Sequence, residues 1–312
     1  MGHRFSPLGN TLRAIVLSTP FAQAMALPAC SQEVGNPPCS DAGRVVALPS
    51  GYRYDGGSLQ CQGLCPKGFF CSADSCPLCS DDGVLSVQCG YPPCIGGRRP
   101  SGLRSTPKVS GSRPVAQFWR QMSHLEAASV IAFDVLRREL RAHGAPRGLI
   151  DRARRAAADE VRHARITAQL CRANGGRCAR ASVSAPKRVR ALDAVARENS
   201  VEGCVRETYG ALVSLWQARH AGDARTRHAM RLIAVDEVSH ADLAWSVASW
   251  AEPRLGGSAR RRIDAARRRA LAELVESTEQ PIPAECVTVA GLPHPVVARK
   301  LAERMGAMLS LG

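Results

Sequence analysis

The sequence predicts an all-α fold: a four-helix bundle with one or two additional C-terminal helices, preceded by a small cysteine-rich disulfide module. The motif Asp-Glu-x-x-His occurs twice, at residues 159–163 and 236–240. A leading glutamate precedes each copy at nearly the same distance: Glu126 lies 34 residues before Glu160, and Glu202 lies 35 residues before Glu237. Runs rich in alanine, arginine and leucine surround these residues and favour helices. We interpret this as one helical hairpin used twice.

Helix signals set the elements in order. The first helix is expected over residues 114–143, where Gly144 stops it, and the second from Pro146 to Asn174, where two glycines end it. The third and fourth helices are expected at residues 189–220 and 223–250, the latter with Asp223 as its N-cap. Two further helices are expected at residues 258–279 and 296–309. These helices form one domain, residues 114–312.

Three side chains in these helices allow two interpretations. Glu126 is either a metal ligand or, with Ser123, part of a capping box, and a helix starting at Pro114 favours the ligand. Tyr209 either packs in the core or lines a substrate path. Glu207 lies about 140° around an α-helix from Glu202, which favours a surface position or a role behind the ligands.

The spacing of the repeated motif has a chemical consequence. A glutamate and a histidine three residues apart on a helix are neighbours on one face, so each Glu-x-x-His offers two metal ligands. With the two leading glutamates, four carboxylates and two imidazoles would face a dry interior, which does not tolerate unpaired charge. Two divalent cations would neutralise them, and this mixed ligand set favours iron or manganese.

The set of ligand residues resembles the ferritin-like superfamily, in particular its symmetric branch, which includes rubrerythrins and the small subunit of ribonucleotide reductase. The resemblance covers about residues 115–251. It implies two iron ions, or manganese or a mixed pair, with Glu160 and Glu237 bridging them. It implies that the terminal ligands are Glu126, His163, Glu202 and His240.

The resemblance also implies a supporting pair of aspartates. In such proteins the aspartate before the motif glutamate often holds the histidine of the other helix. Here that implies contacts of Asp236 with His163 and of Asp159 with His240.

The resemblance implies a dinuclear non-haem iron protein that reacts with a small oxidant, O2 or peroxide, and draws on an electron donor that the sequence does not identify. The chain departs from two members of the branch. No rubredoxin-type metal domain follows the bundle, and no tyrosine follows either motif histidine at the spacing used for radical storage. The alternative is a metal-binding or purely structural protein of the cell envelope with no turnover.

Residues 1–29 are expected to be a lipoprotein-type signal peptide. Arginines begin the segment, and no charged residue occurs from Ala14 to Gln32. Cleavage before Cys30 and lipid attachment there would anchor the protein to a membrane of the cell envelope. A plain secretory signal and a disordered leader are the alternatives.

The 13 cysteines support export. Residues 30–94 hold eight of them besides Cys30 among Gly, Pro and Ser, which is typical of a disulfide-stapled module. A metal site at Cys76-Pro-Leu-Cys79 is the alternative. Residues 95–113 are expected to be a flexible linker. In the helical domain a disulfide between Cys171 and Cys178 would fix the end of the second helix, with free thiols there as the alternative, and Cys286 can pair with Cys204.

The formal charge of +15 raises the question of a nucleic-acid partner. The arginines are spread along the predicted helices, only 4% of the residues are aromatic, and no nucleic-acid-binding motif occurs. We therefore expect no nucleic-acid partner, and an acidic membrane surface is the better match.

Overall fold

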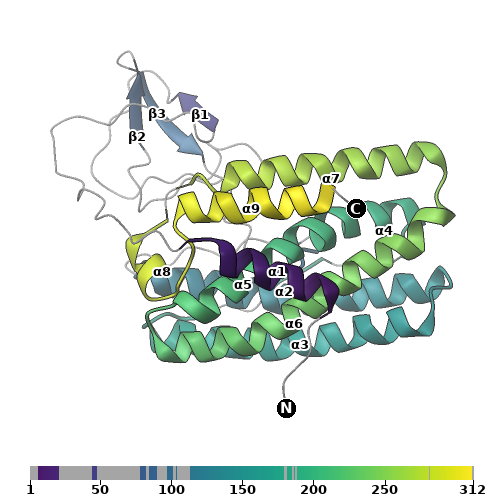
Figure 1. Cartoon of the computed structure of the whole chain (residues 1–312), viewed down its shortest axis with the longest axis horizontal. Helices are drawn as coiled ribbons and strands as arrows, with labels where there is room; N and C mark the ends of the chain where they lie inside the picture. The colour runs from purple at the N-terminus through teal and green to yellow at the C-terminus, as the bar shows by residue number, and fades with distance from the viewer. Residues whose placement is uncertain are drawn as a thin grey trace.

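The computed structural model describes residues 6–20, 44–47, 78–81, 84–89, 97–100, 103, 113–178, 181–184, 186, 188–280 and 282–310. From Arg113 onward the described part is built from helices (Figure 1). These are α2 (Pro114–Ala142), α3 (Arg147–Ala173), α4 (Leu192–Glu198), the π-helix η1 (Asn199–Glu207), α5 (Thr208–His220), α6 (Ala224–Ala251), the 3₁₀ turn η2 (Glu252–Arg254), α7 (Gly257–Ser277), α8 (Ala284–Thr288) and α9 (Pro295–Ser310). The helix α1 (Pro7–Ser18) precedes them in the chain.

The ends of the helices follow the local signals in the sequence. Pro114 opens α2, and Gly144 follows its end with a positive φ of 70°, a conformation that favours glycine. Gly175 does the same after α3 with a φ of 81°. The Asp223 carboxylate caps α6 by accepting a 2.8 Å hydrogen bond from the backbone N–H of Thr226. The expected order of helices is therefore confirmed.

The third long helix of the domain contains an irregularity that the sequence analysis did not predict. The segments α4, η1 and α5 run on without a break, since Glu198 and Thr208 at the two junctions both keep αR backbone angles. The nine residues between them form a π-helix, with hydrogen bonds from residue i to i+5. This changes which side chains of the segment face the interior.

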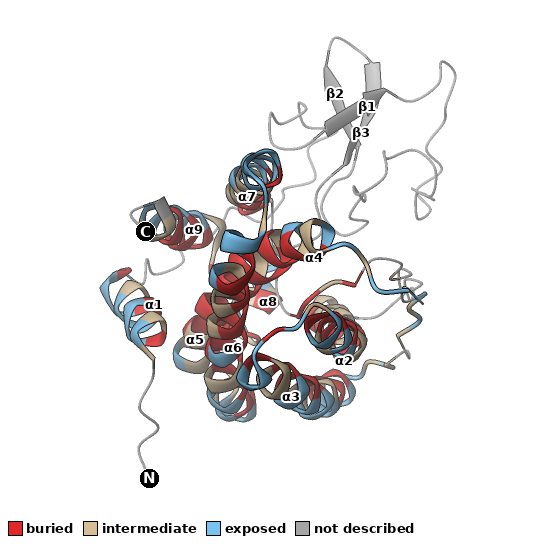
Figure 2. Cartoon of the chain, turned by 90° about the vertical axis from the view of Figure 1, so that its right-hand side faces the viewer, coloured by how far each residue is buried: buried red, intermediate tan, exposed pale blue. Residues whose placement is uncertain are grey.

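The helices pack in a consistent order. α2 packs against α3, α3 against α6, and both η1 and α5 against α6. Figure 2 looks along these helices and shows buried residues on the faces that they turn toward one another. α7 lies against α4 and η1, and α9 against α5 and α7. The ligand-bearing helices thus form the inner group, and the C-terminal helices cover one side of it.

Residues 97–100, within the linker expected over residues 95–113, pack between α2 and η1. Arg98 is 1% exposed, and its guanidinium donates a 2.8 Å hydrogen bond to Asn199 Oδ1. Its carbonyl oxygen accepts a 3.0 Å bond from Ser129 Oγ on α2. A Cβ atom on Gly97, whose φ is 54°, would lie 2.3 Å from that hydroxyl oxygen. The physical reason for the packing is this long-range hydrogen bonding, which local composition does not encode.

The sequence region expected to be a signal peptide contains α1. The side chains of Leu12 and Val16 are buried in the same hydrophobic cluster as residues of α5, α6 and α9. Arg304 of α9 donates hydrogen bonds of 2.9 and 3.0 Å to Ser18 Oγ and Thr19 Oγ1. Removal of a leader ending at residue 29 would take this helix away. Cys30 lies outside the described residues.

Within the cysteine-rich region, the structure describes three strands: β1 (Arg44–Ala47), β2 (Leu78–Asp81) and β3 (Val84–Cys89). They form an antiparallel sheet in the order β1-β3-β2, with Val46 opposite Val87 and Cys79 opposite Ser86. The expected disulfides of this module and the alternative Cys76/Cys79 metal site lie outside the described side chains.

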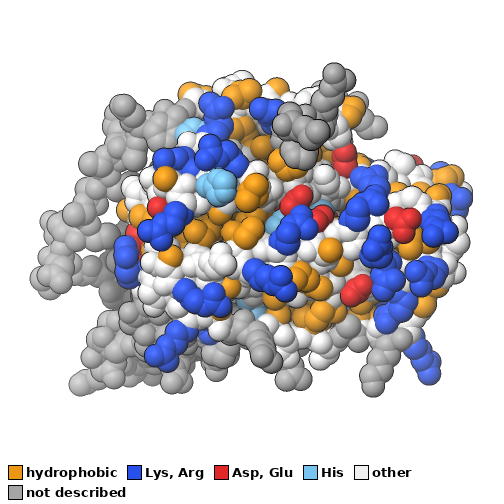
Figure 3. All heavy atoms as spheres, turned by 90° about the horizontal axis from the view of Figure 1, so that it is seen from below, with side chains coloured by type: hydrophobic (Ala, Val, Ile, Leu, Met, Phe, Trp, Pro, Cys, Tyr) orange, Lys and Arg blue, Asp and Glu red, His pale blue; other side chains and the backbone are white. Residues whose placement is uncertain are grey.

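Basic residues are distributed over the helical surface. Figure 3 shows Lys and Arg side chains scattered over the face seen from below, with acidic and hydrophobic side chains between them. Among the described helices, none combines the length and the apolar composition that spanning a membrane requires.

Candidate metal centre

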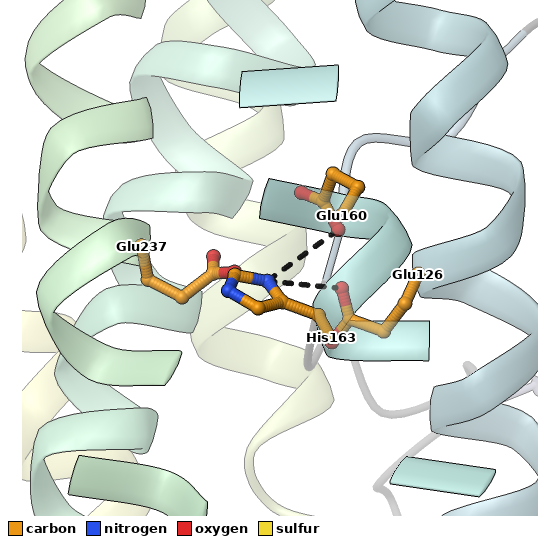
Figure 4. Close-up of side chains that lie close together, drawn as sticks. All are labelled: Glu126, Glu160, His163 and Glu237. Carbon is orange, nitrogen blue, oxygen red and sulfur yellow. Dashed lines mark ion pairs between the residues drawn. The ribbon is translucent and has the colours of Figure 1, made fainter. Parts of the chain in front are cut away.

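Three helices bring four predicted ligands together. Glu126 comes from α2, Glu160 and His163 come from α3, and Glu237 comes from α6 (Figure 4). One potential ligand atom from each of these residues can be chosen so that all four lie within 4.8 Å of one another. All four side chains are buried. The chain therefore has a buried Glu/His cluster that could hold a metal ion.

Glu160 and Glu237 lie between the two histidines. His163 Nδ1 is 3.6 Å from Glu160 Oε2 and 3.2 Å from Glu237 Oε1. His240 Nδ1 is 3.3 Å from Glu160 Oε1 and 3.8 Å from Glu237 Oε1. Each of these carboxylates thus faces both imidazoles, which is the arrangement that a bridging ligand needs. Glu126 lies on the His163 side, with Oε2 3.9 Å from His163 Nδ1.

The aspartates of the two motifs approach the opposite histidines. Asp236 Oδ2 lies 3.1 Å from His163 Nε2, and Asp159 Oδ2 lies 3.4 Å from His240 Nε2. Arg162 contacts both carboxylates, at 2.7 Å from Asp159 and 3.1 Å from Asp236. These are the crossed pairs that the resemblance implies. An Nε2–H donated to an aspartate leaves Nδ1 directed at the glutamates, where a metal would bind.

The polar atoms at the centre of the cluster lack hydrogen-bond partners. Within the described part of the chain, seven such buried atoms belong to the predicted ligands: one oxygen of Glu126, both oxygens of Glu160 and of Glu237, and the Nδ1 atoms of His163 and His240. Buried polar atoms are nearly always hydrogen bonded, because an unpaired one loses its hydration without compensation. These atoms belong to carboxylates and imidazoles, which are the ligand types that divalent iron and manganese bind, so they fit a metal site.

The pKa values of the clustered residues also indicate a site in which positive charge must balance several carboxylates. Burial lowers the pKa of each histidine, but neighbouring carboxylates outweigh it and raise the pKa of His163 well above its usual range and that of His240 to about 10. Burial raises the pKa of Glu126, and the charges of Glu160 and Glu237 raise it further. Burial also favours a high pKa for Glu160, but the two imidazoles hold it well below its usual range. Protons on the imidazoles thus balance the carboxylates, and divalent cations would replace them.

Glu202 does not join this cluster. Its Oε1 accepts a 2.5 Å hydrogen bond from Arg206, and its Oε2 accepts a 3.3 Å bond from the backbone N–H of Arg99. The side chain lines a groove of about 530 Å³ between the α4–η1 segment and α7. The second leading glutamate is therefore turned toward an arginine and a surface groove.

The structure also distinguishes between the two interpretations of Glu126, metal ligand or capping box, and between those of Tyr209, core residue or lining of a substrate path. Ser123 Oγ donates to the carbonyl of Ala164 at 3.2 Å and makes no capping contact, while Glu126 lies inside α2. Tyr209 is buried in the hydrophobic core, and its hydroxyl donates to the carbonyl of Ala298 at 3.3 Å. Glu126 is thus available as a ligand, and Tyr209 is a core residue.

Sequence reasoning missed two buried charged side chains near the cluster. It did not predict that Arg98 is buried, and it expected Glu207 at the surface or behind the ligands. Glu207 is 2% exposed and belongs to η1. The signal for Arg98 would have been the uncommon Gly-Gly-Arg-Arg stretch before the first helix, but nothing in that stretch predicts insertion between two helices.

The cysteines of the helical domain are arranged differently from the expectation. Cys171, Cys178 and Cys204 are free thiols. Burial raises the pKa of Cys171 to about 12, and the adjacent Cys178 adds to this, so these two thiols are neighbours. Cys204 lies on η1, whereas Cys286 lies on α8, which packs against α2. The first expected pair therefore lies together as two thiols without a disulfide, and Cys204 of the second expected pair forms no disulfide either.

The chain was compared with protein-family models, with curated proteins and with solved structures, and none of these comparisons gives a match.

Proposed function

We propose that this chain is a ferritin-like, dinuclear non-haem iron or manganese protein of the cell envelope that reacts with O2 or peroxide. The observation that carries the proposal is a group of seven buried ligand atoms on α2, α3 and α6 that have no hydrogen-bond partner among the described residues. Four of the residues that carry them, Glu126, Glu160, His163 and Glu237, can each place one ligand atom within 4.8 Å of the others. The order Glu, Glu-x-x-His, Glu, Glu-x-x-His along the chain supports the ferritin-like assignment, because helices carrying this set form four-helix bundles with a dinuclear centre.

The residues would divide the work as follows. Glu160 and Glu237 would bridge the two ions, and His163 and His240 would bind one ion each through Nδ1. Asp236 and Asp159 would hold those imidazoles in the correct tautomer. When bound, a reduced pair of iron or manganese ions supplies electrons to a small oxidant. The buried protein surroundings would keep bulk water from the centre.

The groove beside Glu202 is where turnover would need a small oxidant to enter. It lies between α4–η1 and α7 and is lined by both charged and small apolar side chains, including Arg197, Val201, Glu202, Ala266 and Ala270. Glu202 comes from the helix that forms the fourth side of the ligand-bearing group. A small oxidant in this groove would contact Glu202 and the residues of α4, η1 and α7 that line it.

Elemental analysis of the full-length protein tests the metal site. After loading with Fe(II) or Mn(II) without oxygen, the wild-type chain should retain about two ions, and His163→Ala/His240→Ala should retain none, since each ion loses its only imidazole. The matched control is His228→Ala/His294→Ala, which removes two histidines outside the cluster. No retained metal in the wild-type chain, with unchanged stability in the first variant, would leave a purely structural helical protein.

A metal-binding protein without turnover is the second candidate, and the closed centre favours it. Glu126, Glu160, His163, Glu237 and His240 are all between 0 and 2% exposed. Oxygen and peroxide consumption by the Fe(II)-loaded protein separates the candidates. Repeated cycles with an added chemical reductant would establish turnover, and a loaded protein that leaves both oxidants unconsumed would be a metal-binding protein only.

The envelope location belongs to the same proposal. A leader over residues 1–29 and a lipid on Cys30 would anchor the protein to a membrane. Mass spectrometry of the mature protein provides the test. A diacylated N-terminal Cys30, lost together with membrane association in Cys30→Ala, is the expected result. A mature chain that still contains α1 would contradict the signal peptide and agree with the packing of Leu12 and Val16.

A further inference from the structure

The fourth helix contains a second buried glutamate next to the centre. The Glu207 side chain is 2% exposed, and neither of its carboxylate oxygens has a hydrogen-bond partner among the described residues. Glu202, five residues earlier, has both oxygens engaged by Arg206 and the Arg99 amide. An ionised carboxylate without a partner is expensive to bury. Burial of an ionised Glu207 therefore requires a positively charged or hydrogen-bonding partner, and the described residues provide no hydrogen bond to it.

The π-helix explains why Glu207 faces inward. In an α-helix, residues five apart differ by about 140° around the axis, so Glu207 would point away from the face that holds Glu202. In a π-helix the hydrogen bonds join residues five apart, so such residues lie closer to the same face. Both glutamates fall within the nine residues of η1. Glu207 is therefore not directed to solvent, as α-helical spacing predicts, but is buried in a segment that packs against α6.

The groups around Glu207 belong to the metal centre. Burial raises the pKa of Glu207 to about 7, and the nearby charges that act on it are those of Arg98, His240, Glu237 and Glu160. A shared neighbour also links Arg98 to His240: the Arg98 guanidinium lies 5.7 Å from the centroid of the Phe133 ring, and that centroid lies 5.0 Å from the centroid of the His240 ring. The residue after Glu207, Thr208, accepts a 3.3 Å hydrogen bond from Trp245 Nε1 on α6, the helix that carries His240. This contact associates Glu207 with the His240 side of the cluster.

On this side a ligand is missing. The His163 side has a terminal carboxylate, Glu126, whereas the equivalent glutamate on the His240 side, Glu202, is turned to Arg206. We infer that Glu207 is a carboxylate ligand of the metal centre on the His240 side, in the role that Glu126 has on the His163 side. The inference rests on the proposed dinuclear site. Arg98 then offsets part of the negative charge that the fifth carboxylate adds.

The competing explanation is a structural ion pair between Glu207 and Arg98. The two side chains make no hydrogen bond with each other, since both Glu207 oxygens and the Nε and Nη1 atoms of Arg98 are unpartnered within the described chain. If Glu207 were a structural partner of Arg98, its removal would destabilise the protein equally with and without metal. A ligand would be needed only for metal binding, and without metal its removal would relieve an unpaired buried charge.

Titration of the metal-free, full-length protein with Co(II) distinguishes these roles, because visible absorption follows each equivalent of metal. In Glu207→Gln, the second equivalent should bind at least about tenfold more weakly than in the wild type, with the first retained. The melting temperature of the metal-free variant should equal or exceed that of the wild type. Glu202→Gln should have a smaller effect on the second equivalent, and the matched control Glu198→Gln, one turn earlier on the same helix, should have none.

Three results would overturn the inference. Wild-type affinity for both equivalents in Glu207→Gln would remove Glu207 from the ligands and leave the proposed dinuclear site intact. An equal fall in melting temperature with and without metal would make it a structural residue. If Glu202→Gln, and not Glu207→Gln, loses the second Co(II) ion, the carboxylate ligand on the His240 side is Glu202. If the wild-type protein binds fewer than two ions, the proposed dinuclear site fails as well.

Discussion

The first half of the repeat, α2 with α3, and the second half, the α4–η1–α5 segment with α6, place their leading glutamates differently. Glu126 lies on a regular α-helix and joins the cluster. Glu202 lies on a π-helix and pairs with Arg206. The two Glu-x-x-His motifs, by contrast, are arranged alike, each with its histidine held by the other's aspartate. An internally repeated sequence can therefore produce a centre that is symmetric in one pair of helices and asymmetric in the other.

Two features of the packing accompany the difference. Residues 97–100 occupy the space between α2 and η1, and the Arg98 guanidinium binds Asn199 at the start of η1. Gly203 lets η1 approach α6 closely, since a Cβ atom there would lie 2.5 Å from Ala244 Cβ. The equivalent of Gly203 in the first half is Ala127, which is partly exposed. In the second half the π-helix η1 is thus in contact with residues 97–100 as well as with α6.

The largest effect is expected where the two halves share ligands. Glu160→Gln and Glu237→Gln should each weaken the binding of both ions by roughly 100-fold or more, since an amide cannot bridge two cations as a carboxylate does and the effect should exceed that of a group behind the ligands. Metal titration followed by calorimetry gives both affinities. Gln at the exposed Glu303 serves as the control. Loss of only one ion in either variant would contradict a bridging position.

The crossed aspartates should have the next largest effect. Asp236→Asn and Asp159→Asn should each reduce metal affinity by about 10- to 100-fold, because the imidazole loses its negatively charged partner. The effect of Asp236→Asn should fall on the ion bound by His163, and that of Asp159→Asn on the ion bound by His240. Paramagnetically shifted imidazole signals of the Co(II) protein would show which histidine is affected.

Asp242→Asn, elsewhere on α6, is the matched control for these two variants. If either aspartate variant changes both histidine signals equally, or neither of them, the crossed arrangement is not the one present in solution.

Exchanging Gly203 and its counterpart Ala127 tests whether η1 is packed closely against α6. Gly203→Ala should destabilise the protein by about 1–3 kcal/mol, because the added methyl group has no room against Ala244. The reciprocal change, Ala127→Gly, should cost no more than about 1 kcal/mol, the usual cost of glycine in a helix. Chemical denaturation of both metal-free variants gives the comparison, and equal values would show that η1 is not held closely against α6.

Much of this centre follows from sequence because its determinants are local. The ends of α2 and α3 follow from Pro114, Gly144 and Gly175, which act through their own backbone preferences. The approach of Glu160 and His163 follows from their spacing on one helix, and the second motif repeats it.

The rest depends on contacts between distant segments or on a change of helix type. Helical periodicity assumes 3.6 residues per turn, so it places Glu202 inward and Glu207 outward, and η1 breaks that assumption. Arg98 stands in a polar stretch whose composition is typical of a linker, and its partner Asn199 is 101 positions away in the sequence. Composition cannot report such a pairing, because the two residues meet only after the helices have packed.

The smallest effect is expected from pH, and it concerns the metal-free protein. The pKa of His240 is about 10, well above its ordinary value of 6.5, so its stabilisation is complete below pH 6.5 and is lost as pH rises toward 10. Glu126 also makes the folded state less stable as pH rises, because its pKa is raised in the folded state and its ionisation there costs more free energy than in the unfolded chain. Glu160, whose pKa is lowered, adds stability above pH 4.5 that stays constant in this range.

Melting temperatures of the EDTA-treated protein should therefore fall between pH 6.5 and pH 9.5, and the decline should be shallower in His240→Ala, which removes one of the titrating groups. The metal-loaded protein should show a smaller decline, because its imidazoles are already deprotonated by the ions and have no proton left to lose. A melting temperature that rises with pH in the metal-free protein would show that the imidazoles are neutral in the folded state. The carboxylates would then share protons among themselves, and the balance of charge would no longer depend on the two histidines.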